Sequence, residues 1–292
     1  MAFSKSFLKQ MKTALREDVG RGDVTSNTLI PSKAEGHAII LAKESGIFCG
    51  VPVIRELLKL DDPDLQVKFF IRDGERFRRG QDVIELKGNV RSILKVERTL
   101  VNFLSWICGI ATTTGAFVKR TSKYAVKVLD TRKTTPLWRE LEKYAVKAGG
   151  GVNHRMGLYD AILVKENHRP FGDLRRLRRF RNRFIIEVRD FEELREAIRL
   201  NPRSILFDNF SPAQLKKAVR WVRGRAPKIV LEASGGITLQ NASRYASAGV
   251  DQISVGSITH SVKALDFSLL IERLPDRQAD LRAKRSIRPS HR

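Results

Sequence analysis

Residues 184–209 read FIIEVRDFEELREAIRLNPRSILFDN, and this stretch decides the fold. Two apolar runs, FIIEVRD (184–190) and SILFDN (204–209), flank FEELREAIRL (191–200), where apolar residues recur every three or four positions. Asp190 and Glu193 have the spacing of a capping box, which predicts that a helix starts at Asp190. A strand, a helix and a second strand in this order predict a parallel sheet covered by helices.

The same alternation extends from about residue 124 to residue 260. Helical patterns separate the other apolar runs, which are VKVLD (126–130), ILVKENH (162–168), KIVLEASGG (228–236) and QISVGSITH (252–260). Ser211 with Gln214 has capping-box spacing, and Pro212 suits a first helical position. GGGVNHRMGLYD (149–160) leaves room for one more strand. An incomplete or distorted α/β barrel is therefore as compatible with the pattern as a regular one.

Polar residues end the successive strands of this predicted barrel. They are Asp130, Lys165 with Glu166, Glu187, Asp208, Glu232 with Ser234, and Ser254. The carboxyl ends of parallel barrel strands are where such folds build their active sites. We therefore expect these side chains to meet at one mouth.

The first part of the chain has a different pattern. HAIILAKESGIFCGV (37–51) and LQVKFFIRDGERFRRGQDVIELKG (65–88) predict an antiparallel sheet with turns at Asp73–Gly74 and Arg79–Gly80. The RGD triplet within GRGDV (20–24) is best interpreted as a turn. An amphipathic helix is expected near the start, with one apolar face made by Phe3, Phe7, Leu8, Met11 and Leu15.

These patterns divide the chain into parts. We expect an α+β domain over residues 1–115 and the α/β barrel over 116–269. The segment 270–292 is expected to pack back on the first domain or to form a basic tail. The uncharged stretch 99–118 is long enough to cross a bilayer, but its asparagine, serine, glycine and threonine residues favour a buried core helix over a membrane span.

Composition narrows the functional classes. Cys49 and Cys108 are too few for a disulfide framework, and the start of the chain lacks a signal-peptide pattern, so we expect a cytoplasmic protein. The net charge of +23 favours anionic partners. Much of it lies in RPFGDLRRLRRFRNRF (169–184) and after Pro275, without the signatures of a nucleic-acid-binding module. A nucleic-acid partner is therefore not favoured.

Two glycine-rich turns and a group of cations predict an anion-binding site. ASGGI (233–237) and SVGSITHS (254–261) follow the last two strands, where barrel enzymes often bind phosphate. Cations near strand ends match carboxylates and phosphates; they are Arg132, Lys133, His154, Arg155 and Lys165, with Arg98 from the first domain. Glu187 and Asp208 suit a phosphate-bound Mg²⁺.

The chain resembles the quinolinate phosphoribosyltransferase family, also called nicotinate-nucleotide pyrophosphorylase (carboxylating), over nearly its full length. Seven motifs in order carry the resemblance: EDVGRGDVTS (17–26), ERTLVNFLSWICGIAT (97–112), LDTRKTTP (129–136), EKYAVKAGGGVNHRMGLYDAILVKENH (142–168), ILFDNFSP (205–212), LEASGGIT (231–238) and ISVGSITHSVKALDFSL (253–269). The resemblance implies a distorted, about seven-stranded TIM-like barrel with an N-terminal sandwich domain. It also implies a homodimer whose active site is shared between subunits, with a hexamer left open.

The implied reaction joins quinolinate to phosphoribosyl pyrophosphate with Mg²⁺, giving nicotinate mononucleotide, pyrophosphate and CO2 in NAD biosynthesis. By motif, the quinolinate carboxylates would be bound by Arg132, His154, Arg155 and Lys165, with Arg98 from the neighbouring subunit. Lys133 would contact the pyrophosphate, and Glu187 and Asp208 the ribose and the metal. The 5′-phosphate would be bound by Ser234, Gly235, Gly236, Gly256 and His260.

One strand departs from the family pattern. Ile185 stands where the family often has a first acid before Glu187, which predicts the loss of one carboxylate beside the metal or ribose. The arginine-rich helix expected at 175–183 is more basic than the motifs demand. We interpret it as a solvated face, or at most as a long-range attraction for anionic substrates.

Three alternatives stay open at the sequence level. Lys165 at a strand end also fits a Schiff-base aldolase, although Glu166 and the other cations favour a charged clamp. A molybdenum-associated relative acting on another acceptor is closer, and the full set of carboxylate-binding cations argues against it. A nucleic-acid-binding protein on the same fold would not need Glu187 and Asp208.

Overall fold

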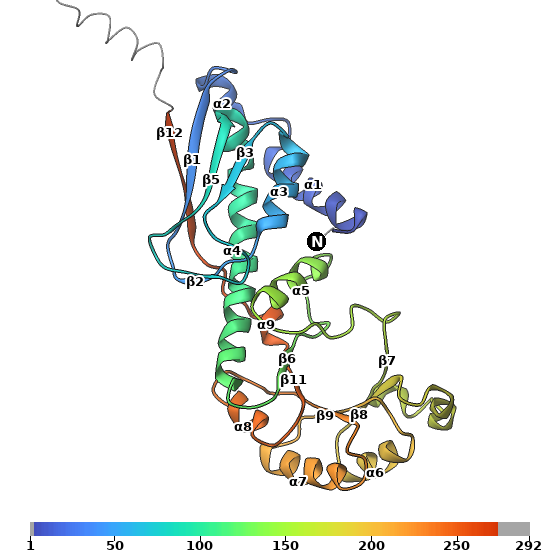
Figure 1. Ribbon diagram of the computed structural model, residues 1–292. Coiled ribbons are helices and arrows are strands. Elements are labelled where there is room, and N and C mark those ends of the chain that lie inside the picture. Colours follow the sequence, from blue (N-terminus) through green and yellow to red (C-terminus); the bar gives the residue numbers. More distant parts are fainter. Residues whose placement is uncertain (1–2, 274–292) are drawn as a thin grey trace, which may run out of the picture.

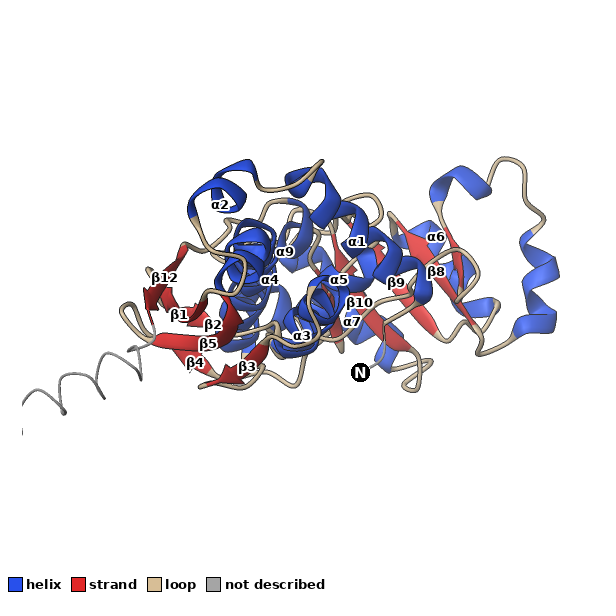
Figure 2. Cartoon of the chain, turned by 90° about the horizontal axis from the view of Figure 1, so that it is seen from above, coloured by secondary structure: helices blue, strands red, loops and turns tan. Residues whose placement is uncertain are grey.

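The computed structural model describes residues 3–273, which form an N-terminal part and a parallel β-sheet with its helices (Figure 1). The N-terminal part contains α1 (Lys5–Val19), α2 (Val24–Leu29), β1 (Glu35–Ala42), β2 (Gly46–Ile47), α3 (Val51–Asp61), β3 (Gln66–Phe69), β4 (Arg76–Phe77) and β5 (Asp82–Asn89). A long helix, α4 (Val90–Thr121), follows. Figure 2 shows the two groups of strands at opposite ends, with α1, α3, α4 and α5 (Arg139–Ala148) between them.

The second part is built around the parallel sheet. Its elements are β6 (Lys127–Leu129), α5, β7 (Ile162–Val164), the 3₁₀ helices η1 (Glu166–His168) and η2 (Leu174–Phe180), β8 (Phe184–Val188), α6 (Phe191–Arg199), β9 (Ser204–Asp208), α7 (Pro212–Arg223), β10 (Val230–Ser234), α8 (Ala242–Ala246), β11 (Gln252–Ser254) and α9 (Ser257–His260). The last strand, β12 (Phe267–Arg273), returns to the N-terminal sheet.

The N-terminal sheet is antiparallel, as predicted, with strand order β12-β1-β5-β3. Gly74 and Gly80 adopt positive φ angles of 87° and 81°, which glycine allows at the two predicted turns. The helix α1 buries Phe7, Met11 and Leu15 along one side, in agreement with its amphipathic pattern.

The last described strand, β12, joins this sheet by pairing with β1 from Ala42↔Phe267 to Gly36↔Arg273. The part of the predicted segment 270–292 up to Arg273 therefore packs on the N-terminal part. Residues 274–292 lie outside the described residues.

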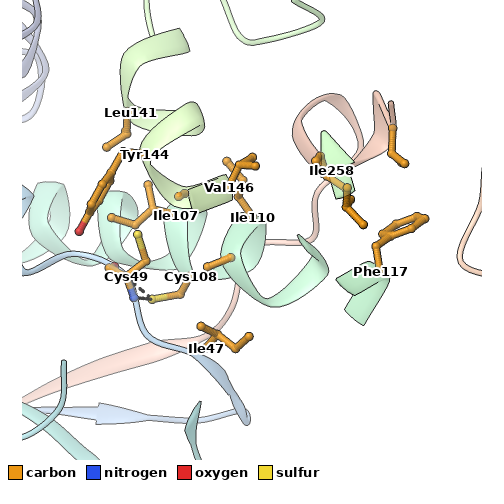
Figure 3. Close-up of a cluster of buried hydrophobic side chains, with 14 of the residues drawn as sticks. Ile47, Cys49, Ile107, Cys108, Ile110, Phe117, Leu141, Tyr144, Val146 and Ile258 are labelled. Carbon is orange, nitrogen blue, oxygen red and sulfur yellow. Dashed lines mark hydrogen bonds between the residues drawn. The ribbon is translucent and has the colours of Figure 1, made fainter. Parts of the chain in front are cut away.

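The helix α4 joins the two parts. Asn89 caps its start by accepting hydrogen bonds from the N–H groups of Arg91 and Ser92. Figure 3 shows its side chains Ile107, Cys108 and Ile110 between Ile47 and Cys49 of the N-terminal part and Leu141, Tyr144 and Val146 of α5, with Phe117 on the side of Ile258. Among the described residues α4 is the one helix long and apolar enough to cross a membrane, and 61% of its most apolar stretch is buried in the protein. The expected boundary at residue 115 falls inside α4, the buried helix predicted over 99–118, so one continuous helix joins the two parts.

The parallel sheet has the order β6-β11-β10-β9-β8-β7. Residues on its outer side are apolar and buried, including Ile186, Ile205, Phe207, Leu231 and Ile253. The helices α6, α7 and α8 cover that side (Figure 1). The inner side carries Glu187, Asp208, Glu232, Ser234 and Ser254, because side chains alternate along a strand.

The expected extra strand in 149–160 is reduced to a single parallel bridge between Val152 and Leu129. Among residues 3–273 no strand ladder joins Val152 to β7, so the barrel is open there. Six strands and one bridge agree with the expected distorted barrel of about seven strands.

One local prediction was wrong, and another was only partly right. The arginine-rich segment forms the 3₁₀ helix η2, shorter than the predicted helix at 175–183. Its half-buried residues Leu174, Leu177 and Phe180 recur every third position, which matches three residues per turn. The helix α6 starts after Asp190 as predicted, because the Asp190 carboxylate accepts from the Glu193 N–H at 2.8 Å. The Glu193 side chain does not complete a capping box; it accepts a hydrogen bond from the N–H of Arg189 and pairs with the Arg189 guanidinium at 2.7 Å.

Candidate active site

A cavity of about 690 Å³ opens at the carboxyl ends of the parallel strands. Every site residue predicted from the sequence lines it except Arg98. The set comprises Arg132, Lys133, His154, Arg155, Lys165, Glu187, Asp208, Ser234, Gly235, Gly236, Gly256 and His260. The alternating direction of side chains along each strand turns these polar groups inward while the apolar ones pack against the helices.

The loop after β6 carries Arg132 and Lys133, and hydrogen bonds fix its backbone. The Lys133 N–H donates to the Thr131 hydroxyl at 3.0 Å, and its carbonyl accepts from the Thr259 hydroxyl at 2.7 Å. Arg139 donates through Nε to the Thr134 hydroxyl at 3.0 Å. Both cationic side chains are exposed to solvent, so the loop is held in place while its charges stay free for a ligand.

Buried charges on α5 support this loop from below. Lys143, 1% exposed, donates to Asp130 at the end of β6 and to the His154 carbonyl at 2.9 Å. Burial raises the pKa of Asp130 and lowers the pKa of Lys143, and their mutual attraction opposes both shifts. Glu142, also buried, accepts from the Thr135 N–H at 3.3 Å. The ion pair therefore connects the loop after β6 to the loop that carries His154.

Two arginines of the cavity wall, Arg132 and Arg155, lie close enough for their charges to interact. Arg155 is 8% exposed and donates through Nη1 to the Ala161 carbonyl at 2.9 Å. Burial and the nearby charge of Arg132 both lower the pKa of Arg155. An arginine stays charged in proteins, so the two cations repel each other and an anionic ligand would relieve that repulsion.

Three carboxylates of the cavity lie close together. One oxygen from each of Glu166, Glu187 and Asp208 lies within 4.8 Å of the others. Lys165 pairs with Glu187 at 3.1 Å, and the Asn209 amide donates to Asp208 at 2.9 Å. Oxygen ligands at this spacing fit a hard divalent cation such as Mg²⁺.

Ile185 lies two residues before Glu187 on β8, opposite Leu163 of β7 and Ser204 of β9. Leu163 and Leu206 also line the cavity. The inner surface next to Glu187 is therefore partly apolar where the family often carries a further acid.

The glycine-rich turns bring backbone close to the cavity. Gly235 has φ of +94°, and a Cβ there would lie 2.2 Å from Asn209 Oδ1, so only glycine fits. Gly236 has φ of +61°, and a Cβ at this position would meet no atom within 4 Å. A Cβ at Gly256 would lie 3.0 Å from His260 Nε2 and 3.1 Å from Lys133 Cδ. Because these positions carry no Cβ, an anion could approach their backbone N–H groups closely.

Arg98 lies apart from the cavity. It is an exposed residue in the N-terminal half of α4, and it does not line the cavity of its own chain. Its predicted role depends on a neighbouring subunit.

Sequence reasoning missed several residues of the site. Glu166 was noted at a strand end but not assigned to the metal, and the Asp130–Lys143 pair and Arg139 were not assigned at all. Glu232 was noted only as a strand-end acid, although its spacing of two from Ser234 puts both on the inner side. That period-two spacing is the signal that could have found it.

Known proteins match both parts of the chain. The model of the quinolinate phosphoribosyl transferase C-terminal domain matches residues 110–270, and that of the N-terminal domain matches 23–108. The chain is 39% identical over 261 residues to a probable nicotinate-nucleotide pyrophosphorylase [carboxylating] of Bacillus subtilis, covering 87% of this chain and 89% of the relative. It is 38% identical over 271 residues to the nicotinate-nucleotide pyrophosphorylase [carboxylating] of Mycobacterium leprae, covering 89% and 95%.

A solved structure has a similar fold. The nicotinate-nucleotide pyrophosphorylase from Francisella tularensis superposes with a TM-score of 0.86 at 37% identity, covering 93% of this chain and 98% of that one.

Proposed function

This chain belongs to the quinolinate phosphoribosyltransferase family, and on that premise we propose how its cavity carries out the family reaction. The reaction transfers the phosphoribosyl group of phosphoribosyl pyrophosphate to quinolinate, with loss of CO2, and yields nicotinate mononucleotide for NAD biosynthesis. One observation supports the assignment most: a single cavity combines paired cations, a carboxylate cluster and a glycine-rich anion cradle.

Quinolinate binds at the cation-rich side. Arg132 and Arg155 provide planar guanidinium groups that match its two carboxylates, and Lys165 adds a compact charge. The repulsion between Arg132 and Arg155 favours a ligand with two negative charges over one with a single charge. His154 contacts the same ligand from the loop 149–160, between α5 and β7.

Phosphoribosyl pyrophosphate binds along the remaining wall. Ser234, Gly235, Gly236 and Gly256 bind the 5′-phosphate through backbone N–H groups, with His260 beside them. Lys133 lies between the two substrates and contacts the pyrophosphate, and Glu187 and Asp208 face the ribose hydroxyls.

Mg²⁺ accompanies the pyrophosphate. Glu166, Glu187 and Asp208 would hold it, directly or through water, because their oxygens converge within 4.8 Å. When bound, the cation neutralises negative charge on the departing pyrophosphate.

The chemistry needs positioning more than a covalent nucleophile. Departure of pyrophosphate leaves positive charge on the ribose, and the cavity holds the quinolinate nitrogen where it can attack. Lys133 stabilises the negative charge that develops on the leaving group. Decarboxylation then follows, because the pyridinium formed can stabilise the electron pair left at the ring carbon.

A second copy of the chain completes the site. Leu137, Leu158, Tyr159 and Phe171 are 73%, 74%, 87% and 94% exposed. They lie on the same loops that carry Arg132, Arg155 and Lys165. An apolar rim of this kind is typical of a surface that another protein covers. We propose that a homodimer covers it and that Arg98 enters from the partner.

We also propose that the enzyme works in the cytoplasm. The free thiols of Cys49 and Cys108 suit a reducing compartment, and α4 is committed to the core that joins the two parts.

The direct test is an assay of the purified protein with quinolinate, phosphoribosyl pyrophosphate and Mg²⁺. We expect nicotinate mononucleotide and CO2 in equal amounts, and no product when chelator removes the cation. Turnover of nicotinate or another acceptor in place of quinolinate would contradict the substrate assignment.

A further inference from the structure

A buried acid lies in the part of the cavity that is otherwise built for anions. Glu232 of β10 is 1% exposed and lines the cavity next to His154 and Ser254. The negative charge of Glu232 opposes the binding of a dianion. The mechanism proposed above assigns no role to this residue. A buried carboxylate is retained only where its partners compensate for the loss of water.

Neighbouring groups hold both the backbone and the imidazole of His154 in place. Its Nδ1 accepts the Arg155 N–H at 2.7 Å, so in the neutral ring the proton is on Nε2. The backbone N–H of His154 donates to Asp130 at 2.8 Å, and the backbone carbonyl of His154 accepts from Lys143 at 2.9 Å. The Nε2 atom lies 3.4 Å from Glu232 Oε1.

The same oxygen of Glu232 also accepts a hydrogen bond from a neighbouring strand. The Ser254 hydroxyl of the neighbouring strand β11 donates to Oε1. The Ser254 hydroxyl and the imidazole nitrogen 3.4 Å away therefore both lie at this one oxygen. Glu232 therefore links a strand of the sheet, β11, to the imidazole of His154, which belongs to the irregular loop 149–160.

We propose that Glu232 is a positioning residue for quinolinate. It holds the Nε2–H of His154 at the cavity wall, where that proton is shared with a carboxylate of the substrate. Ser254 in turn fixes Glu232. This proposal rests on the proposed function, because the ligand that benefits is quinolinate.

The sign of one kinetic effect separates this role from plain charge repulsion. If Glu232 acted on quinolinate only through its charge, its removal would lower the KM for quinolinate. If it positions His154, removal raises that KM. Glutamine keeps the accepting oxygen without the charge, and alanine loses both.

The test compares Glu232→Ala, Glu232→Gln and Ser204→Ala. Ser204 is also buried in the barrel, where its hydroxyl donates to the Val230 carbonyl at 2.9 Å, but it does not line the cavity. We expect Glu232→Ala to raise the KM for quinolinate about tenfold or more, the loss of one hydrogen bond to a charged group. The KM for phosphoribosyl pyrophosphate should change less than about threefold, and Glu232→Gln should recover most of the loss. Ser204→Ala should leave both values unchanged.

A lower KM for quinolinate in Glu232→Ala would overturn the proposal, as would equal increases for both substrates. A second measurement does not depend on turnover. In NMR spectra, the Nε2–H of His154, assigned by its loss in His154→Asn, should exchange slowly with water in the wild type and in Glu232→Gln, and rapidly in Glu232→Ala. Unchanged exchange in Glu232→Ala would refute the contact. Failure of the enzyme to use quinolinate, with this exchange pattern intact, would instead refute the proposed function.

Discussion

Arg132 and Lys133 are neighbours in sequence, yet the proposed roles assign them to different substrates. Arg132 faces Arg155 and the quinolinate side, whereas Lys133 lies against Gly256 and the phosphate cradle. Adjacent like charges repel, so their proximity has a cost that two anions meeting at this point would offset.

The two residues should therefore be separable by mutation. Arg132→Ala is expected to raise the KM for quinolinate by about tenfold or more, because a bidentate contact is lost. Lys133→Ala is expected mainly to lower kcat and to weaken phosphoribosyl pyrophosphate, because charge on the leaving group is no longer neutralised. Steady-state kinetics with each substrate varied would show this, and equal effects of both changes on both substrates would contradict it.

At this scale the sequence predicted residue types better than contacts. Strand-end position and motif placed twelve of the predicted residues around one cavity, because alternation along a strand is a local property. The contact between His154 and Glu232 depends on how the irregular loop 149–160 folds over the barrel, and no local pattern determines that.

At the scale of elements, α5 acts as a support for the site. Its Glu142 and Lys143 are buried and bind the loop after β6, while Tyr144 donates to Asp73 of the N-terminal part. Asp73 in turn accepts from the N–H of Gly50 at the start of α3 at 2.7 Å. The helix α5 thus connects the loop after β6, which carries Arg132 and Lys133, to the N-terminal part of the molecule.

Loss of the charge on α5 should be costly. Lys143→Met leaves Asp130 buried without its cation, which we expect to destabilise the protein by roughly 3–5 kcal/mol. Chemical denaturation would measure the loss. The double variant Asp130→Asn with Lys143→Met should recover part of it, and a double variant less stable than the single one would argue against the pairing.

The helix α2 offers a test of pH dependence. Hydrogen bonds from the Ser26 hydroxyl and N–H lower the pKa of Asp23, the last residue of the RGD triplet, below 3.8. A lowered pKa means that the carboxylate stabilises the fold above the unfolded pKa and that this contribution is lost as the pH falls through the folded pKa. Asp23→Ala should therefore lower Tm at neutral pH, and the gap to wild type should shrink in acid. A gap that stays constant with pH would refute this.

Strands and most helices were predictable because their patterns are local. The exceptions were set by context. The arginine-rich segment has apolar residues every third position and forms a 3₁₀ helix, and the expected strand in 149–160 keeps only the bridge at Val152. Pairing at the open side of a barrel depends on neighbours far away in sequence.

For the whole molecule, the central prediction is a site built from two chains. At quinolinate concentrations well below the KM, Arg98→Ala and Arg132→Ala should each strongly lower the activity of a homodimer. A hybrid dimer of one variant chain with the other, purified with two different tags, would contain one site that has lost both residues and one intact site. We expect it to recover about half of the wild-type activity.

Hybrid dimers with no more activity than either parent would show that Arg98 acts within its own chain or not at all. A monomer in analytical ultracentrifugation that retained full activity would contradict the shared site directly.

The pairing of β12 with β1 has a consequence for how the chain can be divided. Because the last described strand borders the first one, the whole barrel is inserted between two adjacent strands of one sheet. No single cut can release the barrel with the N-terminal sheet intact, since any fragment that ends before Phe267 exposes the edge of β1. A circular permutant that links residue 273 to the start of α1 would preserve both that edge and the core contacts of α1, and new ends could then be opened in the surface turn at Arg79–Gly80.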